Sequence, residues 1–259
     1  LRMELLWTPG GETTDSMVVW LPAQRICFTG NLFSALFGHF PNLVTIRGDR
    51  YREALTFIES LERVRALEPD LLLVGHHGPI RGAEVIGREL TRLRDAVQFV
   101  HDETVKGMNH GKDVHTLMRE VELPAELAVG EGYGKVSWSV RAIWENYAGW
   151  FHHRSTTELY PVPPNAMHGD LVELAGGANA VAARAAGRLE QGAAVEAIQL
   201  AEVALSAEPA NLAALEVMID AHEVLEGQSE NFWLTQWLRK QLDGLRSSLD
   251  AAQKRESKS

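Results

Sequence analysis

The amino-acid sequence predicts an α/β domain followed by an all-helical region, and two patterns carry this prediction. In residues 1–82, short apolar runs of strand length alternate with loops and with one helical stretch. From residue 83 onward, apolar residues recur at the three- and four-residue spacings of amphipathic helices. The order strand, helix, strand in the first part is typical of a layered α/β domain.

The first region contains three predicted strands and one helix. Residues 17–21 (Met-Val-Val-Trp-Leu) and 25–28 (Arg-Ile-Cys-Phe) are short apolar runs on either side of a turn, which predicts a hairpin or meander. From Tyr51 the apolar positions follow a helical period. Residues 71–74 (Leu-Leu-Leu-Val) then predict a fully buried strand, because Pro69 and Gly75 bound the run.

Three helices are predicted next. The first carries a long apolar stripe that begins at Val85. The second starts after Asp113, a typical N-cap residue, and ends near Val121. The third carries apolar and aromatic residues at helical spacing through Trp150. Its aromatic face belongs either to the domain core or to a subunit interface, where Trp and Tyr are enriched.

The remaining sequence predicts a linker and a second helical region. Residues 160–164 (Tyr-Pro-Val-Pro-Pro) are stiff and extended. Residues 176–247 predict four Ala- and Leu-rich helices, whose spacing resembles tetratricopeptide helix pairs. We therefore expect an α/β part at 1–82, helical regions at 83–165 and 166–247, and a flexible tail at 248–259.

The composition excludes several classes of protein. Hydrophobic residues at 45% and charged residues at 23% are ordinary for a globular protein. No run approaches the roughly 18 apolar residues of a membrane span, and the net charge of −10 argues against nucleic acid as a partner. The single cysteine, Cys27, lies in an apolar run and is predicted to be buried. No amino-terminal targeting segment is visible, which leaves cytoplasm and periplasm both open.

Two segments place polar side chains where predicted strands end beside glycines. Residues 8–12 (Thr-Pro-Gly-Gly-Glu) include Glu12, and residues 75–78 (Gly-His-His-Gly) include His76. Loops at strand ends are common positions for functional sites in α/β folds. A carboxylate and an imidazole are both suitable ligands for zinc. Taken alone, each residue is also compatible with an ordinary hydrogen-bonded loop.

The order of these segments resembles the linear alkyl sulfatases of the metallo-β-lactamase superfamily, in which a glutamate follows the Thr-Pro-Gly loop. Residues 42–48 (Asn-Leu-Val-Thr-Ile-Arg-Gly) are similar to the segment that lines the sulfate pocket in that family. Three further segments resemble the family's helical dimerisation domain: 132–137 (Gly-Tyr-Gly-Lys-Val-Ser), 147–151 (Tyr-Ala-Gly-Trp-Phe) and 161–164 (Pro-Val-Pro-Pro). The resemblance covers residue 7 to about residue 225.

This resemblance implies a partial αββα sandwich, a homodimer and a metal-dependent hydrolase of small sulfate esters or related anions. Metal-activated water is the expected nucleophile. Glu12 and His76 are the expected zinc ligands, with Asn31 at the position of the bridging carboxylate in a site that holds two zinc ions in the family. The remaining expected contacts are to substrate, from Asn42, Arg47 and His77.

Two departures from the family leave two hypotheses open. The His-x-His-x-Asp-His motif is absent from the 259 residues, and the neutral Asn31 replaces a carboxylate. The first hypothesis is an alkyl-sulfatase-like enzyme of which this chain is an incomplete and by itself inactive piece. The second is a non-catalytic dimerisation or helical-repeat module that retains a degenerate metal site.

Overall fold

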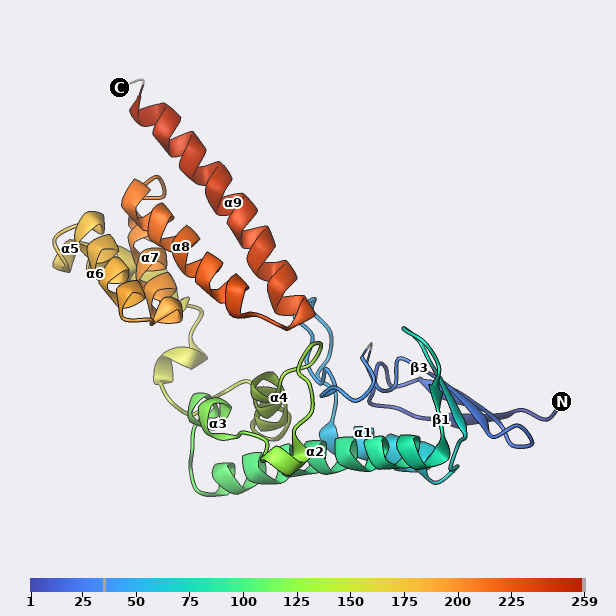
Figure 1. Ribbon diagram of the computed structural model, residues 1–259. Helices are drawn as coiled ribbons and strands as arrows, with labels where there is room; N and C mark the ends of the chain where they lie inside the picture. Colours follow the sequence, from blue (N-terminus) through green and yellow to red (C-terminus); the bar gives the residue numbers. More distant parts are fainter. Residues whose placement is uncertain (35, 258–259) are drawn as a thin grey trace. The chain divides into compact units, whose positions relative to one another are not determined.

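The computed structural model describes residues 1–34 and 36–257, and the chain divides into two compact units, Leu1–Glu158 and Leu159–Ser259. The first unit contains the sheet and helices α1 to α4, and the second contains helices α5 to α9 (Figure 1). The prediction of an α/β part followed by a helical part is therefore confirmed. Among the described helices, none is long and apolar enough to cross a membrane.

Five strands form a mixed sheet in the order β1-β2-β3-β4-β5. Strands β3 and β4 are parallel, and the other neighbouring pairs are antiparallel. The predicted hairpin is confirmed as β2 and β3, and the predicted strand at 71–74 is confirmed as β4. Its predicted full burial is wrong, because only Leu72 is buried and the other three residues are partly exposed. The bounds of the strands are β1 Glu4–Trp7, β2 Met17–Leu21, β3 Ile26–Gly30, β4 Leu71–Val74 and β5 Ile80–Arg81.

One face of this sheet packs on helices α1 (Ala54–Arg65) and α2 (Ala83–Asn109), which lie along it (Figure 1). The strand residues that point toward the helices are buried: Val18, Trp20, Cys27 and Leu72. They share one hydrophobic core with residues of both helices, including Phe57 and Leu90. The predicted burial of Cys27 is confirmed. This core holds the sheet on the two helices and thereby positions the loops that follow its strands.

The opposite face of the sheet is apolar and exposed. The strand pairing aligns Leu5 with Val19 and Val19 with Phe28, so these side chains point to the same side. Leu5 is 65% exposed, Trp7 58%, Met17 55% and Phe28 41%. A contiguous apolar surface of this kind is typical of a face that packs against another layer.

The rest of the first unit is helical. Helix α3 (Val114–Glu120) begins at Asp113, whose carboxylate accepts hydrogen bonds from the backbone N–H groups of His115 and Thr116, as its N-cap prediction requires. The short 3₁₀ helix η1 spans Ala125–Leu127, and helix α4 spans Val136–Ala148. The third predicted helix thus ends before Trp150, because Gly149 has a φ of 76° that breaks the helix.

The aromatic stripe that the sequence predicts through Trp150 divides between core and surface. Trp144 is buried in the core together with Val140 and Ile143. Tyr147 and Trp150 are exposed, at 58% and 70%. The core alternative is thus confirmed for the first part of the stripe. For its exposed last part, the subunit interface stays a prediction.

The second unit is a stack of helices in which consecutive members pack together. Its cores contain many alanines, such as Ala185, Ala197 and Ala221, which let the helices approach closely. Helix α9 continues to Glu256, through part of the predicted flexible tail. Good helix formers and the basic residues Lys254 and Arg255 in the last turn favour this extension. The bounds are η2 Thr156–Leu159, which crosses the unit boundary, η3 Pro164–Met167, α5 His168–Leu174, α6 Ala178–Glu190, α7 Ala194–Ala207, α8 Leu212–Gln228 and α9 Phe232–Glu256.

Candidate functional site

Strand direction brings the predicted site segments to one edge of the sheet. Strands β1, β3 and β4 run in the same direction, because β2 is antiparallel to both β1 and β3, and β3 is parallel to β4. The loop after β1 carries Glu12, the residue after β3 is Asn31, and the residues after β4 include His76. All three segments therefore leave the sheet at the same edge.

The Glu12 loop is held tightly at its base. Gly10 has a φ of +93°, and a Cβ atom there would lie 2.9 Å from the backbone nitrogen of Phe57 in α1. Ser60 donates a hydrogen bond of 2.6 Å to the carbonyl oxygen of Pro9. Gly11 lies directly against the backbone of Leu32. The glycines are required here because the loop contacts helix α1 on one side and the residue after Asn31 on the other.

Asn31 and the end of β4 lie in direct contact. A Cβ atom on Gly75 would lie 2.2 Å from the Oδ1 atom of Asn31, and the Gly75 N–H donates to the Gly30 carbonyl at 2.8 Å. The structure thus places the Asn31 amide beside the residue that precedes His76. Only a glycine at position 75 leaves room for this arrangement.

The two histidines after β4 are exposed. His77 has a φ of +67°, a conformation that is uncommon for residues other than glycine, although histidine adopts it more often than most. Neither His76 nor His77 has a hydrogen-bond partner in the part of the chain that the structure describes. Their imidazole nitrogens therefore face solvent at the edge where Asn31 lies.

Arg52 is the central polar residue of the site, and the sequence analysis did not identify it. Its side chain is only 7% exposed. Its Nε donates to the backbone oxygen of Glu12 at 2.9 Å, and its Nη1 donates to the backbone oxygen of Asn42 at 2.6 Å. Burial lowers the pKa of Arg52, although Glu12 and Asp49 oppose this effect. One guanidinium group thus joins the Glu12 loop to the predicted anion-binding segment.

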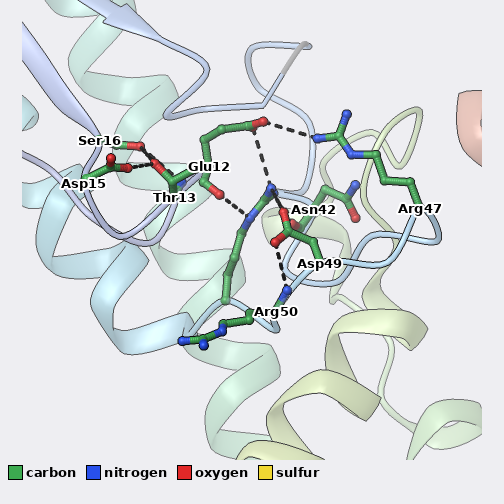
Figure 2. Close-up of polar contacts among 9 residues, drawn as sticks. Glu12, Thr13, Asp15, Ser16, Asn42, Arg47, Asp49 and Arg50 are labelled. Atoms are coloured by element: carbon green, nitrogen blue, oxygen red, sulfur yellow. Dashed lines mark hydrogen bonds and ion pairs between the residues drawn. The ribbon is translucent and has the colours of Figure 1, made fainter.

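The carboxylate of Glu12 pairs with two arginines (Figure 2). Arg47 Nη2 lies 3.3 Å from Glu12 Oε1, and Arg52 Nη2 lies 3.7 Å from Glu12 Oε2. Asn42, which is 4% exposed, lies close to this group. Glu12, Asn42 and Arg47, three of the six predicted site residues, are therefore gathered around Arg52.

A cavity of about 360 Å³ opens beside this cluster. Glu12 and Arg52 line it together with Trp7, Asp49 and Tyr51. The cavity is about the smallest size that small-ligand pockets have. His76 and His77 do not line it.

Residues 130–132 hold the segment that leads to Asn42 in place. Phe40 N–H donates to the Gly130 carbonyl at 2.8 Å, and Gly132 N–H donates to Nδ1 of His39 at 3.1 Å. Burial lowers the pKa of His39, which favours the neutral imidazole that this bond requires. Residues 130–132 are thereby held against the chain that leads to Asn42.

The side chains that the structure describes do not by themselves form a metal site. Within residues 1–34 and 36–257, no three His, Cys, Asp or Glu side chains come together as a possible ligand group. The carboxylate of Glu12 is paired with guanidinium groups, and the Asn31 amide is neutral. Structural and catalytic zinc sites use at least three protein ligands, so the donors present do not fit zinc without additional ligands.

Arg52 was missed for a physical reason. It lies in the polar run at residues 47–53 (Arg-Gly-Asp-Arg-Tyr-Arg-Glu), where local sequence predicts exposed side chains. Its burial depends on the Glu12 loop and the Asn42 segment closing over it. Nothing in the local sequence distinguishes it from Arg50, which lies two residues earlier in the same polar run.

Comparison with known proteins places these features in a family. Residues 114–248, just over half of the chain, match the family described as alkyl sulfatase dimerisation. A linear primary-alkylsulfatase of Pseudomonas sp. is 33% identical over 186 residues, which are 70% of this chain and 34% of that protein. The alkyl/aryl-sulfatase BDS1 of Saccharomyces cerevisiae is 30% identical over 86% of this chain and 35% of its own length.

A solved structure gives the same result. The stereoselective inverting sec-alkylsulfatase Pisa1 from Pseudomonas sp. is 27% identical, with a TM-score of 0.83 over 96% of this chain and 39% of that chain. The chain thus spans about a third of the length of the curated relatives that it matches. The family match, together with these relatives, confirms the resemblance predicted from the sequence: the chain belongs to the alkyl sulfatase family.

Proposed function

We propose that the full-length protein hydrolyses small sulfate esters, and that Arg47, Arg52 and Asn42 form its anion contact. The observation that carries this proposal is the pairing of two guanidinium groups with one carboxylate beside a cavity. Arginine binds sulfate-like oxyanions through charge-assisted hydrogen bonds in a fork geometry. The names of the relatives, all of them sulfatases of alkyl or aryl esters, support the same substrate class.

We further propose that the full-length protein depends on a metal, with zinc as the expected ion. Glu12 and His76 are the proposed ligands, Asn31 occupies the bridging position, and His77 contacts substrate. Their segments leave the same edge of the sheet, which supports a common site. Because the donors among residues 1–34 and 36–257 do not suffice, the remaining ligands would come from other polypeptide of the protein.

The exposed face of the sheet supports the proposal that other polypeptide of the full-length protein completes this domain. Leu5, Trp7, Met17 and Phe28 are between 41% and 65% exposed on a surface that apolar residues dominate. We propose that a second layer of the full-length protein covers them, as in an αββα sandwich of the metallo-β-lactamase type. The relatives are about three times as long as the matched region, so they contain enough polypeptide for such a layer.

The helical part is proposed to form a homodimer, since it matches the family described as alkyl sulfatase dimerisation. The exposed Tyr147 and Trp150 are suitable interface residues. The same proposal includes the functional division of the chain into 1–82, 83–165, 166–247 and 248–259. It also includes the tetratricopeptide-like character of the helix pairs.

One observation favours a second candidate function, a non-catalytic dimerisation or helical-repeat module. It is the lack of a three-ligand group among the described residues, together with the neutral amide of Asn31. Under this alternative, the Glu12 cluster is a structural salt bridge that ties two loops together. Metal content and turnover of the full-length protein distinguish the two functions.

The decisive experiment combines metal analysis with a sulfate-release assay on the full-length protein, with dodecyl sulfate as the first substrate. We expect at least one equivalent of bound metal and a release rate that falls at least about 100-fold in Arg47→Gln, because oxyanion contacts of this kind contribute on that order. Arg81→Gln is the control, because Arg81 is exposed in β5, does not line the cavity, and its side chain has no hydrogen bond or ion pair to the described residues. A full-length preparation without metal and without sulfate release would leave the non-catalytic module as the function.

A further inference from the structure

Each oxygen of the Glu12 carboxylate faces a different arginine. Oε1 lies 3.3 Å from Arg47 Nη2, and Oε2 lies 3.7 Å from Arg52 Nη2 (Figure 2). A planar carboxylate between two guanidinium groups occupies the position that an oxyanion ligand takes when it binds a pair of arginines. The side chain of Glu12 therefore stands where an external anion would bind.

The two arginines differ in how firmly they are held. Arg52 is 7% exposed and donates to two backbone carbonyls, so its guanidinium group is fixed. Arg47 is 50% exposed and precedes Gly48, which has a φ of +81°. Glu12 is 31% exposed. The site thus combines one fixed, buried cation with a half-exposed cation and a partly exposed carboxylate.

Arg52 also has an unused donor. Its Nη2 atom is buried and has no hydrogen-bond partner, since Glu12 Oε2 and Asp49 Oδ2 both lie 3.7 Å away. Buried donors without partners are costly and are usually satisfied by a ligand or water. An oxyanion in place of the Glu12 carboxylate can approach this donor at hydrogen-bond distance.

From these contacts we infer that Glu12 is an internal competitor for the anion site of Arg47 and Arg52, and that a sulfate-class oxyanion binds by displacing its carboxylate. This inference rests on the proposed function, because it takes the anion contact at Arg47 from it. It adds that the Glu12 carboxylate occupies the anion site when no external anion is bound, and it assigns Arg52 as the fixed cation of that site. By linkage, any cation that binds the Glu12 carboxylate strengthens anion binding, and the anion strengthens cation binding by the same factor.

The test is titration of the full-length protein, stripped of metal, with inorganic sulfate at constant ionic strength, followed by calorimetry or by NMR shifts. Glu12→Gln keeps the shape of the side chain but removes its negative charge. Because the competing ion pair is partly exposed, its loss is expected to tighten sulfate binding about fivefold. Asp15→Asn is the matched control, since Asp15 lies in the same loop and its recorded partner is Thr13. We expect this control to change the affinity less than about twofold, through screened long-range charge alone.

The outcomes separate the inference from the proposed function. If Glu12→Gln binds sulfate no more tightly than Asp15→Asn does, the displacement is wrong. If Arg47→Gln leaves sulfate affinity unchanged in both the wild-type and Glu12→Gln backgrounds, the anion contact of the proposed function is wrong instead. If no variant binds sulfate, both are overturned. Thermal melts of each variant establish that the fold is retained.

Discussion

Replacement of Arg52 by methionine is the most informative single change in the first unit. Arg52 donates to the Glu12 carbonyl at 2.9 Å and to the Asn42 carbonyl at 2.6 Å, and its side chain is nearly inaccessible to solvent. Methionine has a similar length and an apolar character, so it fills the space but leaves both carbonyl oxygens without their donor. The loss therefore falls on hydrogen bonding rather than on packing.

The expected cost follows from these two bonds. Hydrogen bonds from a charged donor contribute about 1.5–3 kcal/mol each to the free energy of unfolding. The two bonds together are thus worth about 3–6 kcal/mol, and relief of the buried charge offsets part of that loss. We expect Arg52→Met to destabilise the first unit by about 3 kcal/mol. Arg52→Lys keeps the charge, but its single nitrogen cannot reach both carbonyls in the same geometry, so about half of this loss is expected.

The assay is urea unfolding monitored by tryptophan fluorescence. Trp233 and Trp237 lie in the second unit, so both are replaced by phenylalanine in the background protein to leave only the tryptophans of residues 1–158. This step matters because a chain with two units need not unfold in one transition. Arg50→Met serves as the control, because Arg50 is a neighbouring arginine that is exposed.

The result that would refute the reasoning is equally specific. If the free energies of unfolding of Arg52→Met and Arg50→Met lie within about 0.5 kcal/mol of each other, which is the usual spread of surface substitutions, Arg52 does not join the two loops. An effect in Arg52→Met that Arg52→Lys reproduces in full would indicate that the geometry of the guanidinium fork, rather than charge, accounts for the loss.

Three further predictions concern residues around the site and the core. Burial lowers the pKa of His39 from its ordinary value of 6.5, so the unfolded chain binds a proton at a higher pH than the folded chain does. The free energy of unfolding should therefore fall as the pH drops below about 6.5. In acid denaturation curves, His39→Gln should lose this dependence. Gly134→Ala places a Cβ 2.2 Å from the Pro41 carbonyl oxygen and should cost about 1–3 kcal/mol in urea unfolding, whereas Gly87→Ala in α2, where a Cβ meets nothing within 4 Å, should be neutral or stabilising. Burial raises the pKa of Cys27 to about 12, so the thiol should react with a disulfide reagent only as fast as the first unit opens; fast labelling of the native protein at pH 8 would contradict this.

Local sequence was sufficient for most of the secondary structure. Apolar alternation and turn residues identified β2, β3 and β4, and the Asp113 N-cap located the start of α3. These features depend on short-range rules, namely the period of the side chains and the hydrogen bonds of a capping residue. The end of α4 was misplaced at Trp150 because the aromatic spacing continued past Gly149, whose positive φ ends the helix.

Sequence motifs were sufficient to identify the family and to predict Glu12, Asn42 and Arg47 as site residues. This is possible because a site that needs particular side chains requires them in a fixed order along the chain. Only the tertiary structure decided what these residues contact. The pairing of Glu12 with Arg47 and Arg52, and the contact of Asn31 with Gly75, join positions that are 35 to 44 residues apart. Arg52 is the clearest case. Its polar sequence surroundings predict an exposed arginine, whereas the Glu12 loop and the Asn42 segment bury it at the centre of the candidate site.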